Sequence, residues 1–293
     1  VVIDATIKIS EFLNISQLAI GFIVVAVAVS MPDFVVAVTA SLQGSPALGI
    51  GDALGSSIAN ICLVLGIATF IRKIDVERTH TLESAELLLM ISVIPLIILS
   101  KAIVGTFEGI ILLLVFVLYC LFVLKSKFSL KIKDGIKKSE FVKLLILFAI
   151  GMVIVVFSAR MVVDSAVDLA RFLKINEAII GLVVLSFGTT LPELAIDFTA
   201  IRKGQIALAI GDVLGSTVTN LTLILGTVLI ISPTVIDIAI YSVPLAFIVI
   251  ANSFLVYNLY KHQRLGRAQG IAFLGLYILF IGTTIFSSLP KPI

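Results

Sequence analysis

Apolar stretches long enough to cross a lipid bilayer dominate the pattern of hydrophobic and polar positions along this chain. A membrane-spanning helix needs about 20 mainly apolar residues. The alternation of apolar and polar positions typical of membrane barrels is missing, so the spanning elements are expected to be helices. The pattern predicts nine spans, at 16–43, 45–71, 82–100, 104–126, 140–172, 175–203, 205–231, 237–260 and 268–288.

Two of these spans are interrupted by proline, hydroxyl and acidic residues. Ser30-Met31-Pro32-Asp33 interrupts the span at 16–43, and Thr189-Thr190-Leu191-Pro192-Glu193 interrupts the span at 175–203. Proline removes one helical hydrogen bond and clashes with the preceding turn. The pattern therefore predicts a broken helix at each interruption.

The two interrupted spans belong to an internal repeat. A shift of 160 residues aligns Ile15–Gly66 with Ile175–Gly226 without a gap, and 20 of the 52 positions are identical. The matches include proline, aspartate, asparagine and glycine, which a shared apolar composition does not explain. We infer that the chain contains a duplication.

The same shift divides the chain into two halves. It places Val1–Asn14 on Met161–Lys174, so we expect residues 1–14 to be the second half of a helix whose first half is absent. The predicted units are a first repeat half at 1–126, a basic linker at 127–139 and a second repeat half at 140–293. Counting the partly present first helix, each half then contains five spans.

Lys and Arg residues set the predicted orientation, because cytoplasmic loops are enriched in them. The loop around 127–139 is expected to be cytoplasmic, since it and its edges contain Lys125, Lys127, Lys131, Lys133, Lys137 and Lys138. An odd number of spans in each half makes the halves enter the membrane in opposite senses. The predicted fold class is therefore all-α membrane, with two inverted-topology repeats of five transmembrane helices, the first helix only partly present, and broken helices at a central site. Such repeats are typical of ion-coupled transporters.

The composition supports an integral, multi-pass membrane protein, with the cell membrane as the expected location. Hydrophobic residues make up 60% of the 293-residue chain and charged residues 13%, far from the balance of a soluble domain. A net charge of +3 is too small for a nucleic-acid-binding surface, so nucleic acid is not an expected partner. The two cysteines lie in apolar runs and the two histidines in separate loops, so neither a disulfide framework nor a Cys/His metal site is expected.

Asp33 and Glu193 are the principal candidates for chemistry. A carboxylate at the bilayer centre costs about 2.5–3.5 kcal/mol on insertion scales, which makes such residues functional candidates. The repeat axis should bring the two acids together, where they would repel each other unless a cation or a proton lies between them. The alternative is that each acid only caps a half-helix N-terminus.

Oxygen donors surround these acids at helical spacing. Carboxylate, amide, hydroxyl and carbonyl oxygens without Cys or His suit a hard cation, and a flexible set of this kind favours Ca²⁺ or Na⁺ over Mg²⁺. Hydrogen bonding between packed helices is the alternative role for these side chains. Besides the two acids, the candidate ligands are Asn60, Asn220, Ser30, Ser56, Thr189, Thr190 and Ser216.

Three further acids lie close along the chain to the candidate ligands. Asp52 and Asp212 precede the asparagines by two helical turns, about 12 Å at 1.5 Å per residue. They are possible entrance acids on opposite sides of the centre, or caps of glycine-rich helix starts. Asp197 lies near Arg202, and a structural ion pair between them is expected.

These residues resemble a known family. Gly188-Thr189-Thr190-Leu191-Pro192-Glu193, followed by Gly211-Asp212, Gly215-Ser216 and Asn220, is similar to the second α-repeat of the cation/calcium antiporter superfamily, nearest its sodium/calcium exchanger branch. Ser30-Met31-Pro32-Asp33 with Gly55-Ser56 and Asn60 resembles the first repeat. The resemblance implies a ten-helix exchanger that moves Ca²⁺ against Na⁺, with both acids at the central site and the asparagines and hydroxyls completing it. The ions are then substrates, and no cofactor is expected.

Some positions depart from the family pattern and leave the counter-ion open. The chain has Asp33 where the family usually has Glu, Ala28-Val29 where Gly-Thr is usual, and the neutral Asn220 where some exchangers have Asp. Na⁺ is the expected counter-ion, because hydroxyls beside Glu193 suit a dehydrated Na⁺. The alternative is an H⁺-coupled Ca²⁺/cation exchanger of the same superfamily.

A remote alternative is an intramembrane aspartyl protease. Gly49-Ile50-Gly51-Asp52 matches the Gly-x-Gly-Asp motif of that family, but the Tyr-Asp pair that supplies its second acid does not occur. A passive cation channel is a further alternative. We expect a transporter and not an enzyme.

Overall fold

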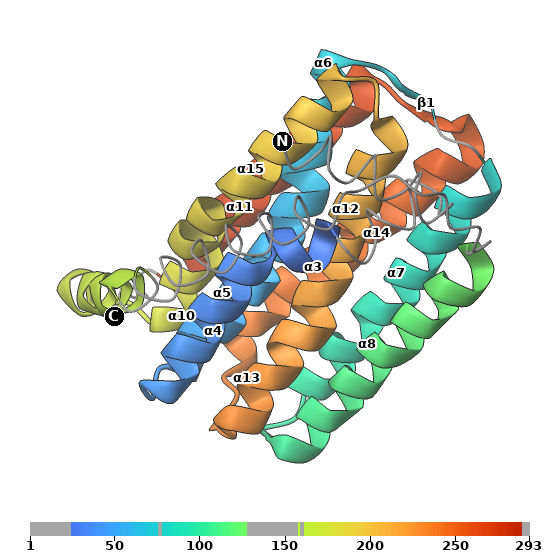
Figure 1. Cartoon of the computed structure of the whole chain (residues 1–293). Coiled ribbons are helices and arrows are strands. Elements are labelled where there is room, and N and C mark those ends of the chain that lie inside the picture. The colour runs from blue at the N-terminus through green and yellow to red at the C-terminus, as the bar shows by residue number, and fades with distance from the viewer. Residues whose placement is uncertain (1–24, 76–77, 128–157, 159–160, 289–293) are drawn as a thin grey trace, which may run out of the picture.

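A computed structural model describes residues 25–75, 78–127, 158 and 161–288, and in that part of the chain the structure is nearly all helical (Figure 1). Seven described helices are long and apolar enough to cross a membrane, and they match seven of the predicted spans. The other two predicted spans are described only in part. Val1–Asn14 and the linker after residue 127 lie outside the described residues, so the expectations for them remain predictions.

The described elements of the first half begin with a short helix and end with a long outer one. Segments marked η are π-helical, with one extra residue per turn. In order they are α3 (Ala26–Val29), α4 (Met31–Leu42), α5 (Pro46–Ile58), η2 (Ala59–Val64), α6 (Leu65–Ile71), β1 (Ile74–Asp75), α7 (Arg78–Leu99), β2 (Ile103–Val104) and α8 (Thr106–Lys127).

The second half repeats this order. A helix at 161–173 precedes α10 (Glu177–Ile179), η3 (Ile180–Leu185), α11 (Ser186–Arg202), α12 (Ile206–Thr219), η4 (Asn220–Ile224), α13 (Leu225–Ile231), β3 (Thr234–Val235), α14 (Ile238–His262), β4 (Arg264–Leu265) and α15 (Arg267–Ser288). Even the turns correspond, because Gly44 and Gly204, 160 residues apart, both have a φ of +81°. Glycine adopts this left-handed conformation without the steric cost that a side chain would add.

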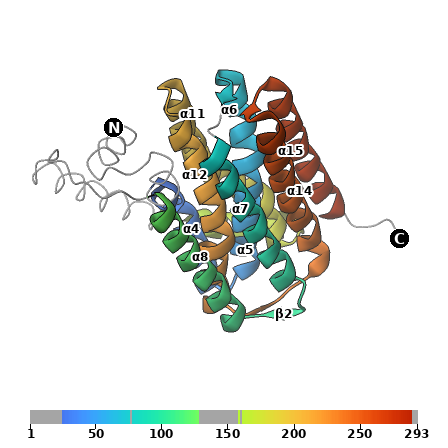
Figure 2. The same ribbon diagram turned by 90° about the vertical axis from the view of Figure 1, so that its right-hand side faces the viewer.

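Two short antiparallel strand pairs join one half to the other. β1 pairs with β4 through Ile74 and Leu265, and β2 pairs with β3 through Ile103 and Val235. The first pair lies at the end of the molecule where α6 and α11 finish, and β2 lies at the opposite end (Figures 1 and 2). An arrangement in which corresponding strands lie at opposite ends is the one expected of an inverted repeat.

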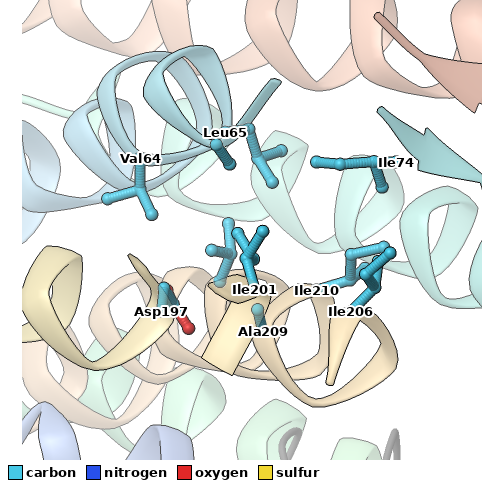
Figure 3. A pocket seen from close by; sticks show the side chains of 10 residues that line it. Val64, Leu65, Ile74, Asp197, Ile201, Ile206, Ala209 and Ile210 are labelled. Atoms are coloured by element: carbon cyan, nitrogen blue, oxygen red, sulfur yellow. The ribbon is translucent and has the colours of Figure 1, made fainter. Parts of the chain in front are cut away.

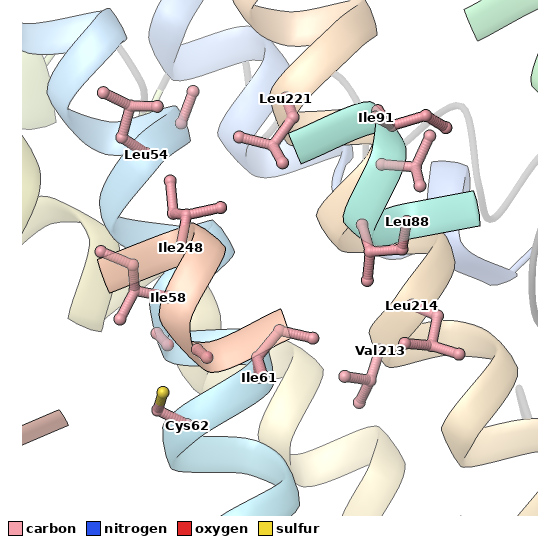
Figure 4. Packing of buried hydrophobic residues seen from close by; sticks show 14 of the residues in the cluster. Leu54, Ile58, Ile61, Cys62, Leu88, Ile91, Val213, Leu214, Leu221 and Ile248 are labelled. Carbon is pink, nitrogen blue, oxygen red and sulfur yellow. The ribbon is translucent and has the colours of Figure 1, made fainter. Parts of the chain in front are cut away.

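The core is formed by the two spans that contain α5 and α12. In each of these spans 78% of the most apolar window is buried, against 22% for the α8 span. Figure 4 shows Leu54, Ile58 and Ile61 of the first span packed with residues of α7, α12 and α14. The outer helix α8 instead exposes large apolar side chains such as Phe107, Leu114 and Leu118, as expected of a surface that contacts lipid.

Close backbone contact joins α5 to the other half. A Cβ added to Gly51 would collide with the carbonyl of Ala178, and one added to Gly181 would collide with the carbonyl of Leu48. Only glycine permits this approach between α5 and the segment of α10 and η3. The glycines thus bring the two interrupted segments to the same depth of the core.

The two interruptions differ in form. In the first half, Ser30 separates α3 from α4, and Pro32 lies in the first turn of α4. In the second half, α11 continues through Pro192, and the irregular turn lies earlier, at η3. The interruption at Thr189–Glu193 is therefore a proline within a continuous helix, and not a gap, because the missing proline N–H leaves only one helical bond unmade.

Candidate cation site

Asp33 and Glu193 lie together in the centre of the molecule. Asp33 is in the first turn of α4, directly after the interruption at Ser30, and Glu193 lies in the middle of α11. Their exposed fractions are 1% and 2%, and the two carboxylates are close enough to interact electrostatically. The Ser30 hydroxyl donates a hydrogen bond of 2.9 Å to Oε1 of Glu193, which links the two halves at this point.

The predicted amides and hydroxyls face these acids crosswise. Asn60 of the first half faces Glu193 of the second, while Asn220 and Thr189 of the second half face Asp33 of the first, together with Ser56. The structure therefore brings most of the predicted ligands around one point at which both halves meet.

Many polar atoms at this point have no hydrogen-bond partner. Buried polar groups in folded proteins are nearly always bonded, so each exception requires an explanation. A bound cation would explain oxygens that converge without donors. The unpartnered buried atoms here are both carboxylate oxygens of Asp33, Oε2 of Glu193, Nδ2 of Asn60, both side-chain atoms of Asn220 and Oγ1 of Thr190.

The asparagines lie on π-helical turns, which the apolar pattern of the sequence does not predict. Asn60 lies in η2 and Asn220 begins η4, at corresponding positions of the two halves. A π-helical turn inserts one residue into a helix, changes the direction of the side chains and is frequent at functional sites. The two turns therefore orient both amides toward the acids of the opposite half.

Asp52 and Asp212 lie in the interior next to the central pair, Asp52 close to Asp33 and Asp212 close to Glu193. Thr189 Oγ1 donates to Oδ1 of Asp52 at 3.2 Å and lies 3.3 Å from Ser56 Oγ. Ser216 Oγ lies 3.3 Å from Oδ1 of Asp212. Both acids are almost fully buried, so neither lies at an open mouth in this structure.

The prediction of an ion pair between Asp197 and Arg202 is wrong. Asp197 is 2% exposed and faces the carboxylates of Asp212 and Glu193, while the Arg202 guanidinium stacks over the Phe198 ring at 5.2 Å from its centroid. Arg202 is five residues further along α11 and so points away from the core, whereas Asp197 lies four residues after Glu193 on the same face. That spacing was the available signal for including Asp197 among the candidate residues.

Together these acids form a row across the core, called the file below, whose members are Asp52, Asp33, Glu193, Asp212 and Asp197. Asp52 interacts with Asp33, Asp33 and Asp212 with Glu193, and Asp212 with Asp197. Among the described residues, no ion pair involves any of the five. Like charges held this close in a medium of low dielectric constant repel strongly unless cations or protons lie between them.

The file is spread out and does not form a compact metal centre. No group of three or more His, Cys, Asp or Glu side chains able to hold a metal ion occurs in the described part of the chain. A cation bound here would depend on amide, hydroxyl and carbonyl oxygens beside one or two carboxylates. Such mixed coordination suits an ion that must be released again.

A narrow crevice begins at the Asp197 end of the file. Figure 3 shows Asp197 beside Ile201 and Ala209, with Val64 and Leu65 opposite. A second crevice adjoins it and shares Asp197 and Ile201. The first crevice leads toward Ile74 of β1 but is too narrow to hold a water molecule, so this side of the file is closed.

Comparison with known proteins identifies relatives over nearly the whole chain. The family model described as sodium/calcium exchanger protein matches residues 1–125 and 143–286. A membrane protein of Methanocaldococcus jannaschii is 32% identical, covering 94% of this chain and 89% of its own length. The inner membrane protein YrbG of Escherichia coli K12 is 30% identical, with coverages of 92% and 86%. The sodium/calcium exchanger MaX1 of Methanosarcina acetivorans is 23% identical, with coverages of 93% and 90%.

Solved structures give the same result. The structure of the sodium-calcium exchanger NCX_Mj soaked with 10 mM Na⁺ and zero Ca²⁺ is similar with a TM-score of 0.76 and 28% sequence identity, covering 96% of this chain and 92% of that one. Another NCX_Mj structure, soaked with 2.5 mM Na⁺ and 0.1 mM Sr²⁺, also has a TM-score of 0.76. The inverted repeat predicted from the sequence is thereby confirmed.

Proposed function

Since this chain belongs to the sodium/calcium exchanger family, we propose that it exchanges Ca²⁺ for Na⁺ across the membrane by alternating access, and that the ions bind between Asp33 and Glu193. The matched relatives with a stated activity are transporters, so the protein is not an enzyme and the protease alternative is excluded. The protein is an integral, multi-pass membrane protein.

The observation that carries this proposal is the file of buried carboxylates at the junction of the two halves. Five acids that are at most 2% exposed lie in a membrane protein whose described residues offer them no basic partner. Each uncompensated charge is costly at this depth. Transported cations would compensate these charges. When one cation leaves, another must replace it to avoid uncompensated carboxylates, and this requirement favours exchange.

The proposed ligands divide by chemistry. Asp33 and Glu193 supply the charge for Ca²⁺. Asn60 and Asn220 supply neutral oxygens from the crosswise arrangement, and Ser56 supplies one from the same half as Asp33. Thr189, Thr190 and Ser30 stand beside the acids, and their hydroxyls suit Na⁺. Ser216 lies closer to Asp212 and to the carbonyl of Ala26, so we assign it to an ion position next to the centre.

We place the β1–β4 end of the molecule in the cytoplasm. Basic residues gather there, as the positive-inside rule requires, in the loops and helix ends that contain Arg72, Lys73, Arg202, Lys203, Arg264 and Arg267. On this topology the halves 1–126 and 140–293 are joined by a cytoplasmic linker at 127–139. The cell membrane is the proposed location.

The test is ⁴⁵Ca²⁺ flux in proteoliposomes loaded with Ca²⁺. An inward Na⁺ gradient at fixed pH should drive Ca²⁺ efflux, and an inward H⁺ gradient without Na⁺ should not. The reverse pattern would assign the protein to H⁺-coupled exchange. Uncoupled Ca²⁺ current in the absence of either gradient would indicate a channel.

A further inference from the structure

Asp197 has no counterpart in the first half of the duplication. The shift of 160 residues places Ala37 at the corresponding position. Ala37 is fully buried, and its backbone carbonyl lies 3.1 Å from where a Cβ on Gly49 would stand. The first half therefore has a buried alanine packed closely against α5 at this position and no acid, so the file of carboxylates is longer toward the β1–β4 end.

The Asp197 carboxylate is buried, and among the described residues it has no basic partner. Its Oδ1 has no hydrogen-bond partner, and neither does Oδ2 of Asp212, which it faces. Asp212 Oδ1 accepts from the Ser216 hydroxyl, but no basic residue of the described chain pairs with either acid. A buried charge that lacks a counter-charge is strongly destabilising. A cation between two such groups would compensate both charges.

Asp197 also lies where a route to the β1–β4 end would begin. It is the one charged residue lining either crevice, and the remaining walls are apolar, with Val64 and Ala68 on one side and Ile201 on the other. If α6 moved away from α11 and α12, Asp197 would be the first carboxylate that an ion from that end meets. In this structure the same apolar side chains close the route.

From these observations we infer that Asp197 and Asp212 form an additional Ca²⁺ position between the central site and the β1–β4 end. The inference rests on the proposed function, because it takes Ca²⁺ as the transported ion. It also makes the exchanger unequal at its two ends. At the opposite end Asp52 stands beside the Thr189 hydroxyl, without a second acid of the Asp197 kind.

Equilibrium ⁴⁵Ca²⁺ binding to purified protein in detergent tests the position itself. Asp197→Asn keeps the shape of the side chain, Asp197→Ala reproduces Ala37, and Asp168→Asn removes an exposed acid away from the file. We expect Glu193→Gln to retain weak Ca²⁺ binding that disappears when Asp197→Asn or Asp197→Ala is added and persists when Asp168→Asn is added. Either an absence of residual binding in Glu193→Gln or residual binding that is unchanged by both Asp197 variants would overturn the inference.

Sided transport tests its role. In oriented vesicles, Asp197→Asn should raise the half-saturating Ca²⁺ concentration about tenfold when Ca²⁺ is supplied at the β1–β4 side, equivalent to about 1.4 kcal/mol. At the opposite side it should change less than about twofold. Equal changes at both sides would contradict a position on one route only, and thermal unfolding without Ca²⁺ confirms that the variants are folded.

The two proposals fail in different ways. If the wild-type protein binds Ca²⁺ through Asp197 but shows no Na⁺-driven flux, the exchange assignment fails and the position stands. If Na⁺-driven flux is normal and both Asp197 variants behave as the wild type in both assays, only this inference fails.

Discussion

Replacing Glu193 with Gln removes one charge from the centre of the file and leaves its shape almost unchanged. The Gln Oε1 can still accept the Ser30 hydrogen bond, which is 2.9 Å long in the wild type. What is lost is one of the two carboxylates proposed to compensate Ca²⁺. The variant therefore separates charge from geometry.

The size of the effect follows from burial. Removing one partner of a buried ionic contact costs about 3–5 kcal/mol, and Glu193 is only 2% exposed. At 1.4 kcal/mol per decade, the dissociation constant for Ca²⁺ at the central site should rise about 150- to 4,000-fold. In the absence of Ca²⁺ the expected effect has the opposite sign, because the variant relieves repulsion with Asp33 and Asp212. The ion-free variant should unfold at the same temperature as the wild type or at a higher one.

Thermal unfolding with and without Ca²⁺, together with ⁴⁵Ca²⁺ flux, measures both effects. A ligand at 100 times its dissociation constant adds about 2.7 kcal/mol to stability, so at that Ca²⁺ concentration the wild type should gain stability and Glu193→Gln should gain far less. Glu86→Gln makes the same chemical change at an exposed position of α7 and should behave as the wild type. Ca²⁺ flux at the wild-type rate in Glu193→Gln, or an unchanged stabilisation by Ca²⁺, would refute the assignment of the central site.

Three further changes probe the ligands, the packing and the surface. Asn60→Ala should raise the half-saturating Ca²⁺ concentration only about two- to twelvefold, since one neutral hydrogen-bonding oxygen contributes about 0.5–1.5 kcal/mol; a loss as complete as that of Glu193→Gln would be inconsistent with a secondary ligand. Gly51→Ala should lower the free energy of unfolding by about 1–3 kcal/mol, because the new Cβ meets the Ala178 carbonyl, whereas Gly188→Ala, with nothing within 4 Å, should leave thermal unfolding unchanged. Lys101→Ala breaks the 2.8 Å ion pair with Glu108 but should cost less than about 1 kcal/mol, since pairs with an exposed partner contribute little; a larger loss in denaturant titration would contradict this.

The parts of this fold that the sequence predicts are those with a long-range pattern. Apolar runs of fixed length place the spans, and the 160-residue shift places Asp33 and Glu193 on one axis, so their proximity follows before any coordinates. The π-helical turns at Asn60 and Asn220 could not be predicted, because one inserted residue hardly changes the apolar pattern of a buried helix. The nearness of Asp197 and Arg202 along the chain predicts an ion pair between them. The pair does not form, because the two side chains point in different directions from α11.

The strand pairs at the two ends of the molecule have a mechanical consequence. Each one fastens the loop that follows an inner helix of one half to the loop between the two outer helices of the other, β1 to β4 and β2 to β3. The paired loops cannot slide apart while these backbone hydrogen bonds last. Any rocking of the outer helices at one face of the membrane must therefore be transmitted as strain to an inner helix of the opposite half. The two strand pairs therefore couple the movements of the two halves, which cannot rearrange independently while both pairs remain intact.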